Sequence, residues 1–319
     1  MLKVGLLTSG GDAPGMNACI KSIVNCAFKK GIEIVGIKRG YQGLIENDYV
    51  VLHNDDVDNI QHIGGTILKT ARSQDFMTEA GFNKAVENIK NMGLDALIVI
   101  GGDGSFRGAR ELDKVGVNVV CIPATIDNDL SYTSRTLGFD TAVNNASFAV
   151  DSVMDTMRSH NRIAVVEVMG RHCGDLALFS AAASNAEIVL LHESPLSYEQ
   201  VLDKVNKQLE DGNEHPTIVL AENLIDISVL TKKLADDTGK EVKKCVLGYT
   251  QRGGKPTVAD KILGLQYGVR ALKEIMERRF GIAIGVIGDS TVTLAIEDAL
   301  NAPSNFNYEL FDLFVTKNN

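Results

Sequence analysis

The sequence predicts an α/β protein with mainly parallel sheets that are flanked by helices. Two observations lead to this class: short apolar runs alternate with segments of helical periodicity along most of the chain, and glycine-rich turns follow two of the runs. Such alternation is typical of parallel sheets, in which right-handed crossovers place the loops after the strands along one edge. We therefore expect the functional residues in those loops.

In the first half of the chain, two strand-like segments lead directly into glycine turns. The first, residues 2–7, is followed by Thr8-Ser9-Gly10-Gly11 and then by apolar residues at helical spacing up to Gly31. The same order recurs where a strand over 96–100 precedes Gly101-Gly102-Asp103 and a helix to about Leu112. The other elements predicted here are strands over 32–37 and 119–122 and, after an irregular stretch, a helix over 79–92.

The second half continues the alternation of strands and helices. The predicted helices cover residues 141–159, 175–185 and 198–209, and the predicted strands cover 163–168, 187–191 and 218–221. No linker rich in proline, glycine or serine and no run of like charge divides the chain. Length suggests about two domains, but composition does not locate the boundary between them.

The composition excludes several functional classes. With 32 Lys and Arg against 41 Asp and Glu, the 319-residue chain has a net charge of −9, which argues against a nucleic-acid partner. The five cysteines never occur as CxxC, so the usual zinc and thioredoxin patterns are missing and a reducing compartment fits best. No apolar run approaches the roughly 18 residues that span a bilayer. We expect a cytoplasmic protein that is neither secreted nor embedded in a membrane.

The two Gly-Gly-Asp turns, at residues 10–12 and 101–103, indicate a phosphate-bearing ligand. Glycine lets the backbone approach a ligand closely, and the helix that follows offers unpaired amides and a partial positive charge. Neither turn is a Walker A motif or a dinucleotide fingerprint. Because Asp103 would repel a pyrophosphate unless a cation lay between them, it is a candidate Mg²⁺ ligand. The alternative is that the glycines serve only the turns.

Two further loops carry groups that suit phosphoryl transfer. Thr125, Asp127 and Asp129 follow a strand and suit proton abstraction from a hydroxyl beside a metal-bound phosphate. An Asx turn after proline is the alternative. Arg171 lies among glycines after another strand, as expected of a guanidinium that is aimed at a phosphate. An exposed arginine in a turn would produce the same pattern.

Together these motifs resemble the bacterial ATP-dependent 6-phosphofructokinase family, and the resemblance covers nearly the whole chain. They follow that family's order and spacing: TSGGDAPGMN at 8–17, GGT at 64–66, GGDGS at 101–105, TIDND at 125–129, VMGR at 168–171 and QRGG at 251–254. GGDGS alone would prove little, because NAD kinases and lipid kinases carry it too.

The resemblance implies transfer of the ATP γ-phosphate to the 1-hydroxyl of fructose 6-phosphate, a step of glycolysis. It implies that Asp127 accepts the hydroxyl proton, that Thr125 and Arg171 steady the phosphoryl group, and that Asp129 assists near Mg²⁺, which Asp103 holds. The residues implied for ATP are Gly11, Arg72, Ser73, Gly102, Asp103, Gly104 and Ser105. Those implied for the sugar phosphate are Thr125, Asp127, Arg162, Met169, Gly170, Arg171, Glu222, Lys243, Tyr249 and Arg252.

The resemblance also implies two three-layer α/β/α domains and a homotetramer. A nucleotide-binding domain would comprise residues 1–138 and 251–301, and a sugar-phosphate-binding domain residues 139–250 and 302–319. Arg162 and residue 243 would reach the 6-phosphate of a neighbouring subunit. ATP is the expected donor, because pyrophosphate-dependent relatives usually carry aspartate at position 104 and lysine at position 124, where this chain has Gly104 and Ala124. Ala124 departs from the glycine that the family usually has at this position. The implied partners are therefore ATP and fructose 6-phosphate, with no nucleic acid and no membrane.

Two departures from the family's pattern concern the sugar phosphate. The family usually has arginine at position 243 and histidine at position 249, where this chain has Lys243 and Tyr249. Lysine keeps the charge but loses the bidentate fork of arginine, and tyrosine offers only a neutral hydroxyl. We expect weaker binding of fructose 6-phosphate, by roughly 1–3 kcal/mol. The alternatives are a kinase for a related ketose phosphate, tagatose 6-phosphate or sedoheptulose 7-phosphate, and a weakly active regulatory paralogue. Retention of Asp103, Thr125, Asp127 and Arg171 argues against the paralogue.

A second group of departures concerns the effector pocket, where relatives bind ADP as activator and phosphoenolpyruvate as inhibitor. Several basic residues of that pocket are replaced, whereas Glu187 and His215 are retained. The corresponding positions are Lys21, Asn25, Asn54, Met154, Asp211 and Asn213. Because only one of these six is a cation, we expect weak regulation by either ligand or none.

Overall fold

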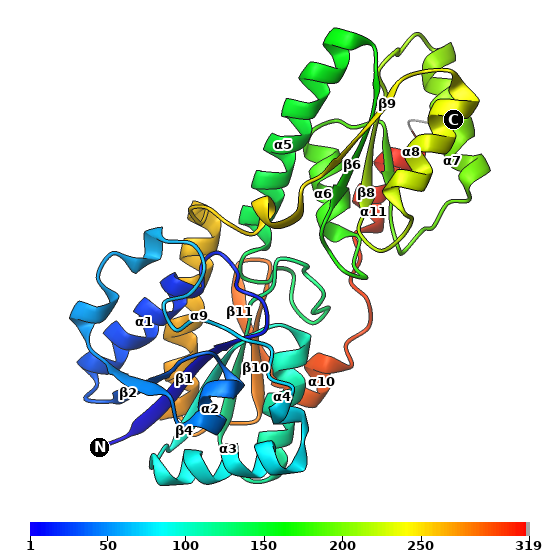
Figure 1. The fold of residues 1–319 in the computed structure, drawn as a ribbon. Helices are drawn as coiled ribbons and strands as arrows, with labels where there is room; N and C mark the ends of the chain where they lie inside the picture. The colour runs from blue at the N-terminus through cyan, green and yellow to red at the C-terminus, as the bar shows by residue number, and fades with distance from the viewer. Residues whose placement is uncertain (317–319) are drawn as a thin grey trace. The chain divides into compact units, whose positions relative to one another are not determined.

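The computed structural model describes residues 1–316, which form two compact units (Figure 1). The first unit comprises Met1–Ile126, Leu130–Thr141 and Arg252–Asn305. The second comprises Asp127–Asp129, Ala142–Gln251 and the chain from Phe306 onward. Residues 127–129, which the predicted boundaries assigned to the nucleotide-binding domain, thus belong to the second unit. Which unit binds which ligand stays a prediction.

A seven-stranded sheet forms the centre of the first unit, in the order β11-β10-β5-β4-β1-β2-β3. The central strands run parallel, whereas the edge strands β3 and β11 are antiparallel to their neighbours. The strands are β1 (Lys3–Ser9), β2 (Glu33–Ile37), β3 (Tyr49–Leu52), β4 (Ala96–Gly101), β5 (Val119–Pro123), β10 (Ile282–Ile287) and β11 (Ser290–Ala295).

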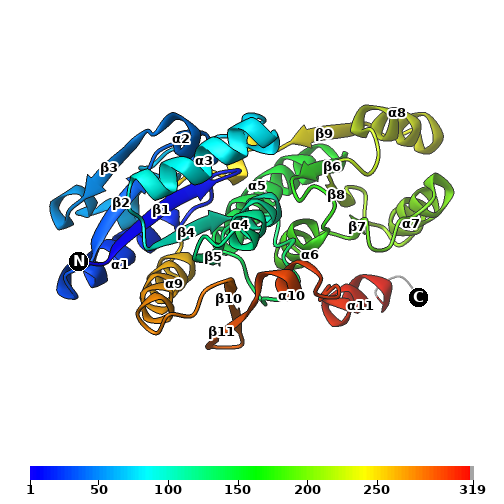
Figure 2. The same cartoon turned by 90° about the horizontal axis from the view of Figure 1, so that it is seen from below.

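Helices cover both faces of this sheet (Figure 2). On one face, α1 (Met16–Lys29) packs against α9 (Val258–Met276). A Cβ added at Gly264 of α9 would lie 2.8 Å from the Gly15 carbonyl oxygen, so glycine permits this close helix contact. The helices on the other face are α2 (Tyr41–Glu46), α3 (Glu79–Asn91), α4 (Asp103–Lys114) and α10 (Ile296–Leu300), and the short 3₁₀ helices of this unit are η1 (Asn54–Val57), η2 (Ile60–His62) and η3 (Asp75–Met77).

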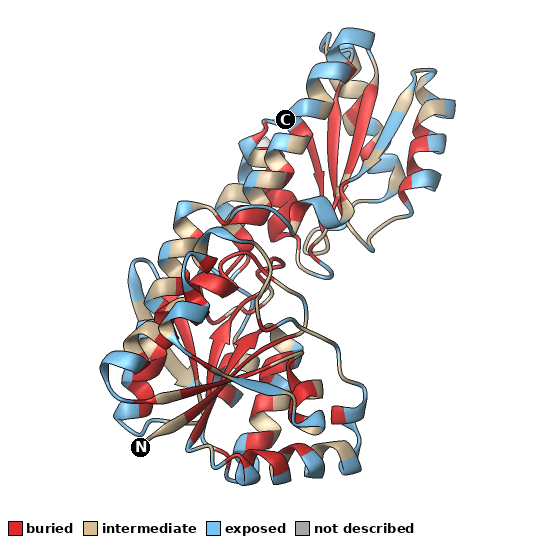
Figure 3. Ribbon diagram, turned by 60° about the vertical axis from the view of Figure 1, so that its left-hand side comes forward, coloured by how far each residue is buried: buried red, intermediate tan, exposed pale blue. Residues whose placement is uncertain are grey.

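The second unit contains a four-stranded, fully parallel sheet in the order β7-β8-β6-β9. Alternate strand residues such as Val165 and Leu220 pack with Val201 and Leu230, so α7 and α8 cover one face. Helix α6 contacts β6, β7 and β8 and covers the other face, and buried residues fill the strands between them (Figure 3). The elements are β6 (Ile163–Val168), β7 (Ile188–Leu190), β8 (Thr217–Ala221), β9 (Val242–Val246), α6 (Asp175–Ala183), α7 (Tyr198–Glu210), α8 (Ile227–Thr238), α11 (Tyr308–Thr316), the 3₁₀ helix η4 (Gly248–Gln251) and, from Ala142 onward, α5 (Phe139–His160).

The predicted α/β class with mainly parallel sheets is confirmed, but several element boundaries differ. Helix α5 begins two residues before the predicted start, because Gly138 N and Thr141 N both donate to the Asp260 carboxylate of α9 at 2.8 Å. The helix predicted over 175–185 ends at Ala183. The stretch predicted to be irregular contains α2 and β3, and β3 depends on antiparallel pairing with β2 rather than on its own short pattern.

Candidate active site

Three loops of the first unit begin at the same edge of the sheet. Ser9 at the end of β1 is in register with Gly101 at the end of β4, and Gly101 is in register with Pro123 at the end of β5. Both Gly-Gly-Asp turns and the loop that carries Thr125 therefore start side by side at the carboxyl ends of adjacent parallel strands. The predicted collection of loops along one sheet edge is present in this unit.

The buried Ser105 lies close to both glycine turns. A Cβ at Gly101 would lie 2.4 Å from the Ser105 Oγ and 2.6 Å from the Ser9 carbonyl oxygen, so only glycine fits there. Gly10 has a positive φ of 86°, and its Cβ position is 3.4 Å from the same Oγ. A Cβ at Gly102 would lie 3.4 Å from the Cβ of Thr125. The backbones of the two turns and the Thr125 side chain thus form one closely packed surface.

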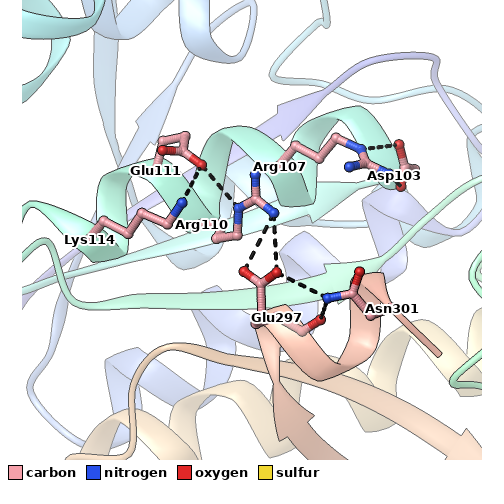
Figure 4. Close-up of polar contacts among 7 residues, drawn as sticks. All are labelled: Asp103, Arg107, Arg110, Glu111, Lys114, Glu297 and Asn301. Atoms are coloured by element: carbon pink, nitrogen blue, oxygen red, sulfur yellow. Dashed lines mark hydrogen bonds and ion pairs between the residues drawn. The ribbon is translucent and has the colours of Figure 1, made fainter.

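Asp103 is the first residue of α4, and Arg107 holds its carboxylate (Figure 4). Arg107 Nε donates to Oδ2 at 2.8 Å and Nη2 donates to Oδ1 at 3.0 Å, and these bonds raise the pKa of Arg107. On the next turn of the helix, Arg110 pairs with Glu111 and Glu297. Asp103 thus lies where a helix N-terminus favours negative charge. The Arg107 guanidinium already forms hydrogen bonds with both of its carboxylate oxygens.

The residues present are compatible with a magnesium site that the nucleotide completes. No cluster of three or more His, Cys, Asp or Glu residues that could hold a metal occurs among residues 1–316. Mg²⁺ commonly takes one or two carboxylates together with phosphate oxygens and water. The Asp103 carboxylate is a ligand of this type, and Arg107 binds both of its oxygens in this structure.

The other residues predicted for ATP differ in their surroundings. A Cβ added at Gly104 would have no heavy atom within 4 Å, so the space beside this glycine is open. Arg72 is exposed. Ser73 Oγ donates to Gln42 Oε1 at 2.6 Å and accepts a hydrogen bond from Phe76 N, so it also stabilises the turn into η3.

Arg252, predicted to contact the sugar, lies against the first glycine turn. Its Nη2 donates to the Asp12 carbonyl oxygen at 2.9 Å and lies 3.2 Å from Asp12 Oδ1. A Cβ at Gly11 would lie 2.1 Å from the same Nη2, so the absence of a side chain at Gly11 makes room for the guanidinium. The Arg252 Nε is buried and has no hydrogen-bond partner in the described part of the chain.

In the second unit, Arg171 lies near Asp127. Its Nε is 3.8 Å from Asp127 Oδ2, and its backbone N donates to Glu222 Oε1 at 3.0 Å. Arg171 has a left-handed φ of 55° and follows Gly170, whose φ is 136°. Non-glycine residues rarely adopt this conformation, and such strain clusters at functional sites. Asp127 is 9% exposed, and Asp129 lies two residues further along the same loop.

Met169, Gly170 and Glu222 follow the carboxyl ends of β6 and β8. Val168 is in register with Ala221, so these residues start at the same level as Arg171. The Met169 backbone N donates to Gln251 Oε1 at 3.1 Å. Sequence reasoning missed this role of Gln251, because a buried glutamine gives no local signal of the amide that it binds. Tyr249, by contrast, is 82% exposed.

Arg162 and Lys243 lie at the opposite end of the same sheet. Arg162 immediately precedes β6, and Lys243 is in register with Ala164 near the start of that strand. Glu241 binds both cations: the Arg162 Nε donates to its Oε2, and the Lys243 Nζ is 2.6 Å from its Oε1. These hydrogen bonds, first that of Lys243, lower the pKa of Glu241. The two cations are thus together, but away from Met169 and Arg171.

No helix in residues 1–316 combines the length and the apolar composition needed to cross a bilayer.

Comparison with known proteins places the chain among sugar-phosphate kinases. The profile of the phosphofructokinase family matches residues 3–275. The chain is 44% identical over 313 residues to the ATP-dependent 6-phosphofructokinases of Clostridioides difficile (strain 630) and Clostridium novyi (strain NT), with 98% of this chain and 98% of each relative covered.

Among solved structures, the phosphofructokinase from Saccharomyces cerevisiae matches with a TM-score of 0.91 and 28% identity. The match covers 100% of this chain and 50% of the yeast chain, so this protein spans half the length of that relative. The sequence profile, the two clostridial relatives and the yeast structure agree with the resemblance that the motifs predicted. The chain therefore belongs to the phosphofructokinase family.

Proposed function

We propose that the protein transfers the γ-phosphate of ATP to the 1-hydroxyl of fructose 6-phosphate, giving fructose 1,6-bisphosphate. The clostridial relatives, which match over nearly their full length, carry the name ATP-dependent 6-phosphofructokinase and favour this reaction over other ketose phosphates. The structural observation that carries the proposal is the proximity of Arg171 to Asp127, 3.8 Å from Nε to Oδ2. A carboxylate beside a guanidinium suits proton removal together with stabilisation of phosphoryl charge.

In this proposal, Asp127 accepts the proton of the 1-hydroxyl as its oxygen attacks the γ-phosphorus. Arg171 and Thr125 stabilise the charge on the transferring group, and Asp129 supports the site. Catalysis of this kind depends mainly on positioning and electrostatic stabilisation. The strained backbone at Arg171 supports such a role, and the hydrogen bond from its backbone N to Glu222 holds that backbone conformation.

The proposed nucleotide site consists of residues from the glycine turns of the first unit and from the segment before η3. They are Gly11, Arg72, Ser73, Gly102, Asp103, Gly104 and Ser105. Asp103 would hold Mg²⁺, which when bound neutralises charge on the phosphates. The open space at Gly104 supports a nucleotide rather than pyrophosphate, because an aspartate side chain there would enter that space.

The proposed sugar-phosphate site needs two copies of the chain. Along β6, about seven residues at roughly 3.3 Å each separate Arg162 from Met169, a distance of about 23 Å that a ketose phosphate cannot span. Arg162 and Lys243 would therefore serve the 6-phosphate in a site whose Met169, Arg171 and Glu222 belong to another copy. This arrangement supports association of at least two copies, which the expected homotetramer would provide. The cytoplasmic location also stays a prediction.

The direct test is formation of fructose 1,6-bisphosphate from fructose 6-phosphate, ATP and Mg²⁺ in a coupled assay. Asp127→Asn should abolish turnover, and the control Asp151→Asn, which changes an exposed acid of α5, should not. Tagatose 6-phosphate and sedoheptulose 7-phosphate should be poorer substrates in parallel assays. Absence of turnover with all three sugars would contradict the proposal and favour a regulatory paralogue.

A further inference from the structure

A buried hydrogen bond joins the loop after β5 to the start of α6. Asn128 Nδ2 donates to Asp175 Oδ2 at 2.8 Å, and the two residues are 5% and 4% exposed. Asn128 lies between Asp127 and Asp129, whereas Asp175 follows the loop that carries Arg171. This one bond therefore ties the loop of the proposed proton acceptor to the loop of the proposed phosphoryl-binding arginine.

The backbone conformation at Asn128 needs support from its surroundings. Its φ is 54°, in the left-handed region that asparagine tolerates better than most residues but still at a cost. Arg171, on the loop at the other side of the bond, also has a positive φ, 55°. Strained loops hold one conformation only where neighbouring groups fix them, and the Asn128 side chain provides such a contact.

Asp175 is the first residue of α6, where a helix N-terminus favours negative charge, but its burial is costly. Its Oδ1 is buried and has no hydrogen-bond partner within the described residues. Burial raises the pKa of Asp175 to about 6, with Glu193 adding to the rise and the Asn128 bond opposing it. The backbone N of the N-cap residue, Gly174, donates to Glu193 Oε1 at 2.8 Å, so Glu193 and not Asp175 binds this amide. The Asp175 carboxylate instead accepts a hydrogen bond from the Asn128 amide.

We propose that Asp175 is a positioning residue of the kinase: acting through Asn128, it fixes the turn that directs Asp127 toward Arg171 and the sugar hydroxyl. This inference rests on the proposed function and assigns a role to a residue outside the motifs that indicated it. Asp175 itself need not touch a substrate. Its removal should therefore lower kcat with little effect on the KM for ATP.

Four variants separate this role from a merely structural one. Asp175→Ala removes the acceptor, and Asn128→Gly removes the amide while still permitting a positive φ. Each should lower kcat about tenfold, because a misplaced catalytic group loses rate steeply. The double variant should be no slower than either single one, since both break the same bond. Asp175→Asn keeps an oxygen acceptor and should retain more than half of the wild-type kcat.

The pH profile gives a second readout. The titratable groups around Asp175 are Cys173 on its own loop and Glu193 after β7, and Asp127 and Asp129 flank its partner. Protonation leaves Asp175 with a neutral oxygen acceptor like that of Asp175→Asn, so the wild-type kcat should fall by no more than about twofold as the pH drops through about 6. The Asp175→Asn enzyme, whose acceptor does not titrate, should retain its activity to lower pH.

A matched control and two separable outcomes complete the test. Glu199→Ala removes the acid in the first turn of α7, away from Asn128, and should leave kcat unchanged. An inactive wild type would refute the proposed function itself. An active wild type with a folded Asp175→Ala variant within twofold of its kcat, or a double variant that shows the product of the single losses, would overturn the positioning role.

Discussion

Arg107 holds both carboxylate oxygens of Asp103, at 2.8 Å from Nε to Oδ2 and 3.0 Å from Nη2 to Oδ1. The residues lie four positions apart on α4, and the Arg107 side chain is 55% exposed. Exposed pairs of this spacing contribute only about 0.2–0.5 kcal/mol. A divalent cation can therefore displace the guanidinium from the carboxylate, but it does so in competition.

Removal of this competition should strengthen magnesium binding. In Arg107→Gln, the Mg²⁺ concentration for half-maximal activity should fall by about twofold, as expected when a pair worth up to 0.5 kcal/mol is lost. Calorimetric titration of the enzyme with MgATP should show the same direction without turnover. Arg110→Gln is the matched control, because Arg110 pairs with Glu111 and Glu297 instead. An unchanged or higher magnesium requirement in Arg107→Gln would refute the competition.

The substitution of two residues should strengthen sugar-phosphate binding. Lys243→Arg with Tyr249→His restores a bidentate fork and a titratable donor, so the half-saturating fructose 6-phosphate concentration should fall at least about fivefold. Lys244→Arg, which changes a neighbouring cation bound to Ser228 Oγ, should have no such effect. If the double variant and the wild type saturate alike, these two positions do not limit affinity.

Two inactive variants should restore activity when mixed. Asp127→Asn lacks the proton acceptor, and Arg162→Ala with Lys243→Ala lacks the cations at the opposite end of β6. If each site takes these groups from different copies, hybrids from an equal mixture should regain about a quarter of the wild-type activity. Co-expression with two affinity tags followed by assay of the doubly tagged enzyme measures this. No recovery in verified hybrids would mean that one copy supplies both groups.

ADP and phosphoenolpyruvate should change the sugar saturation curve by less than twofold. Glu187, retained from the effector pocket of relatives, already accepts hydrogen bonds from Asn213 Nδ2 at 3.0 Å and from Thr217 N at 2.8 Å. Asn213, one of the residues at the positions of the effector pocket, thus forms a hydrogen bond with the Glu187 carboxylate within the same unit. Saturation curves with and without each ligand provide the test, and a several-fold shift by either would contradict the expectation.

The ionised Asp175 should destabilise the folded protein above its pKa. Because the pKa rises from 3.8 to about 6 on folding, the native state binds the proton more tightly, and this stabilisation is complete below pH 3.8 and is lost as the pH rises through 6. The difference in free energy of unfolding between wild type and Asp175→Asn should therefore shift by up to about 3 kcal/mol against the wild type between pH 4 and pH 8. Denaturant titrations of both proteins measure it, and a difference independent of pH would exclude this titration.

Local patterns in the sequence determined the α/β class, the position of both Gly-Gly-Asp turns after strands, and the motifs that identified the family. These features depend on residues close together in the chain: apolar periodicity, glycine at tight turns and helices directly after them. The sequence placed Asp103 in the turn before a helix, whereas the structure shows that Asp103 is the first residue of α4 and is bound by Arg107 one turn later.

Only the tertiary structure decided which distant groups meet. Asp260 caps α5 from a position 119 residues away from Thr141, and Asp175 binds Asn128 across 47 residues. The parallel pairing of β6 with β9 places Arg162 and Lys243 together at the amino ends of these strands, whereas Arg171 follows the carboxyl end of β6. Such contacts follow from strand order, register and side-chain direction, which no local pattern specifies, because each is settled by packing among elements far apart in the chain.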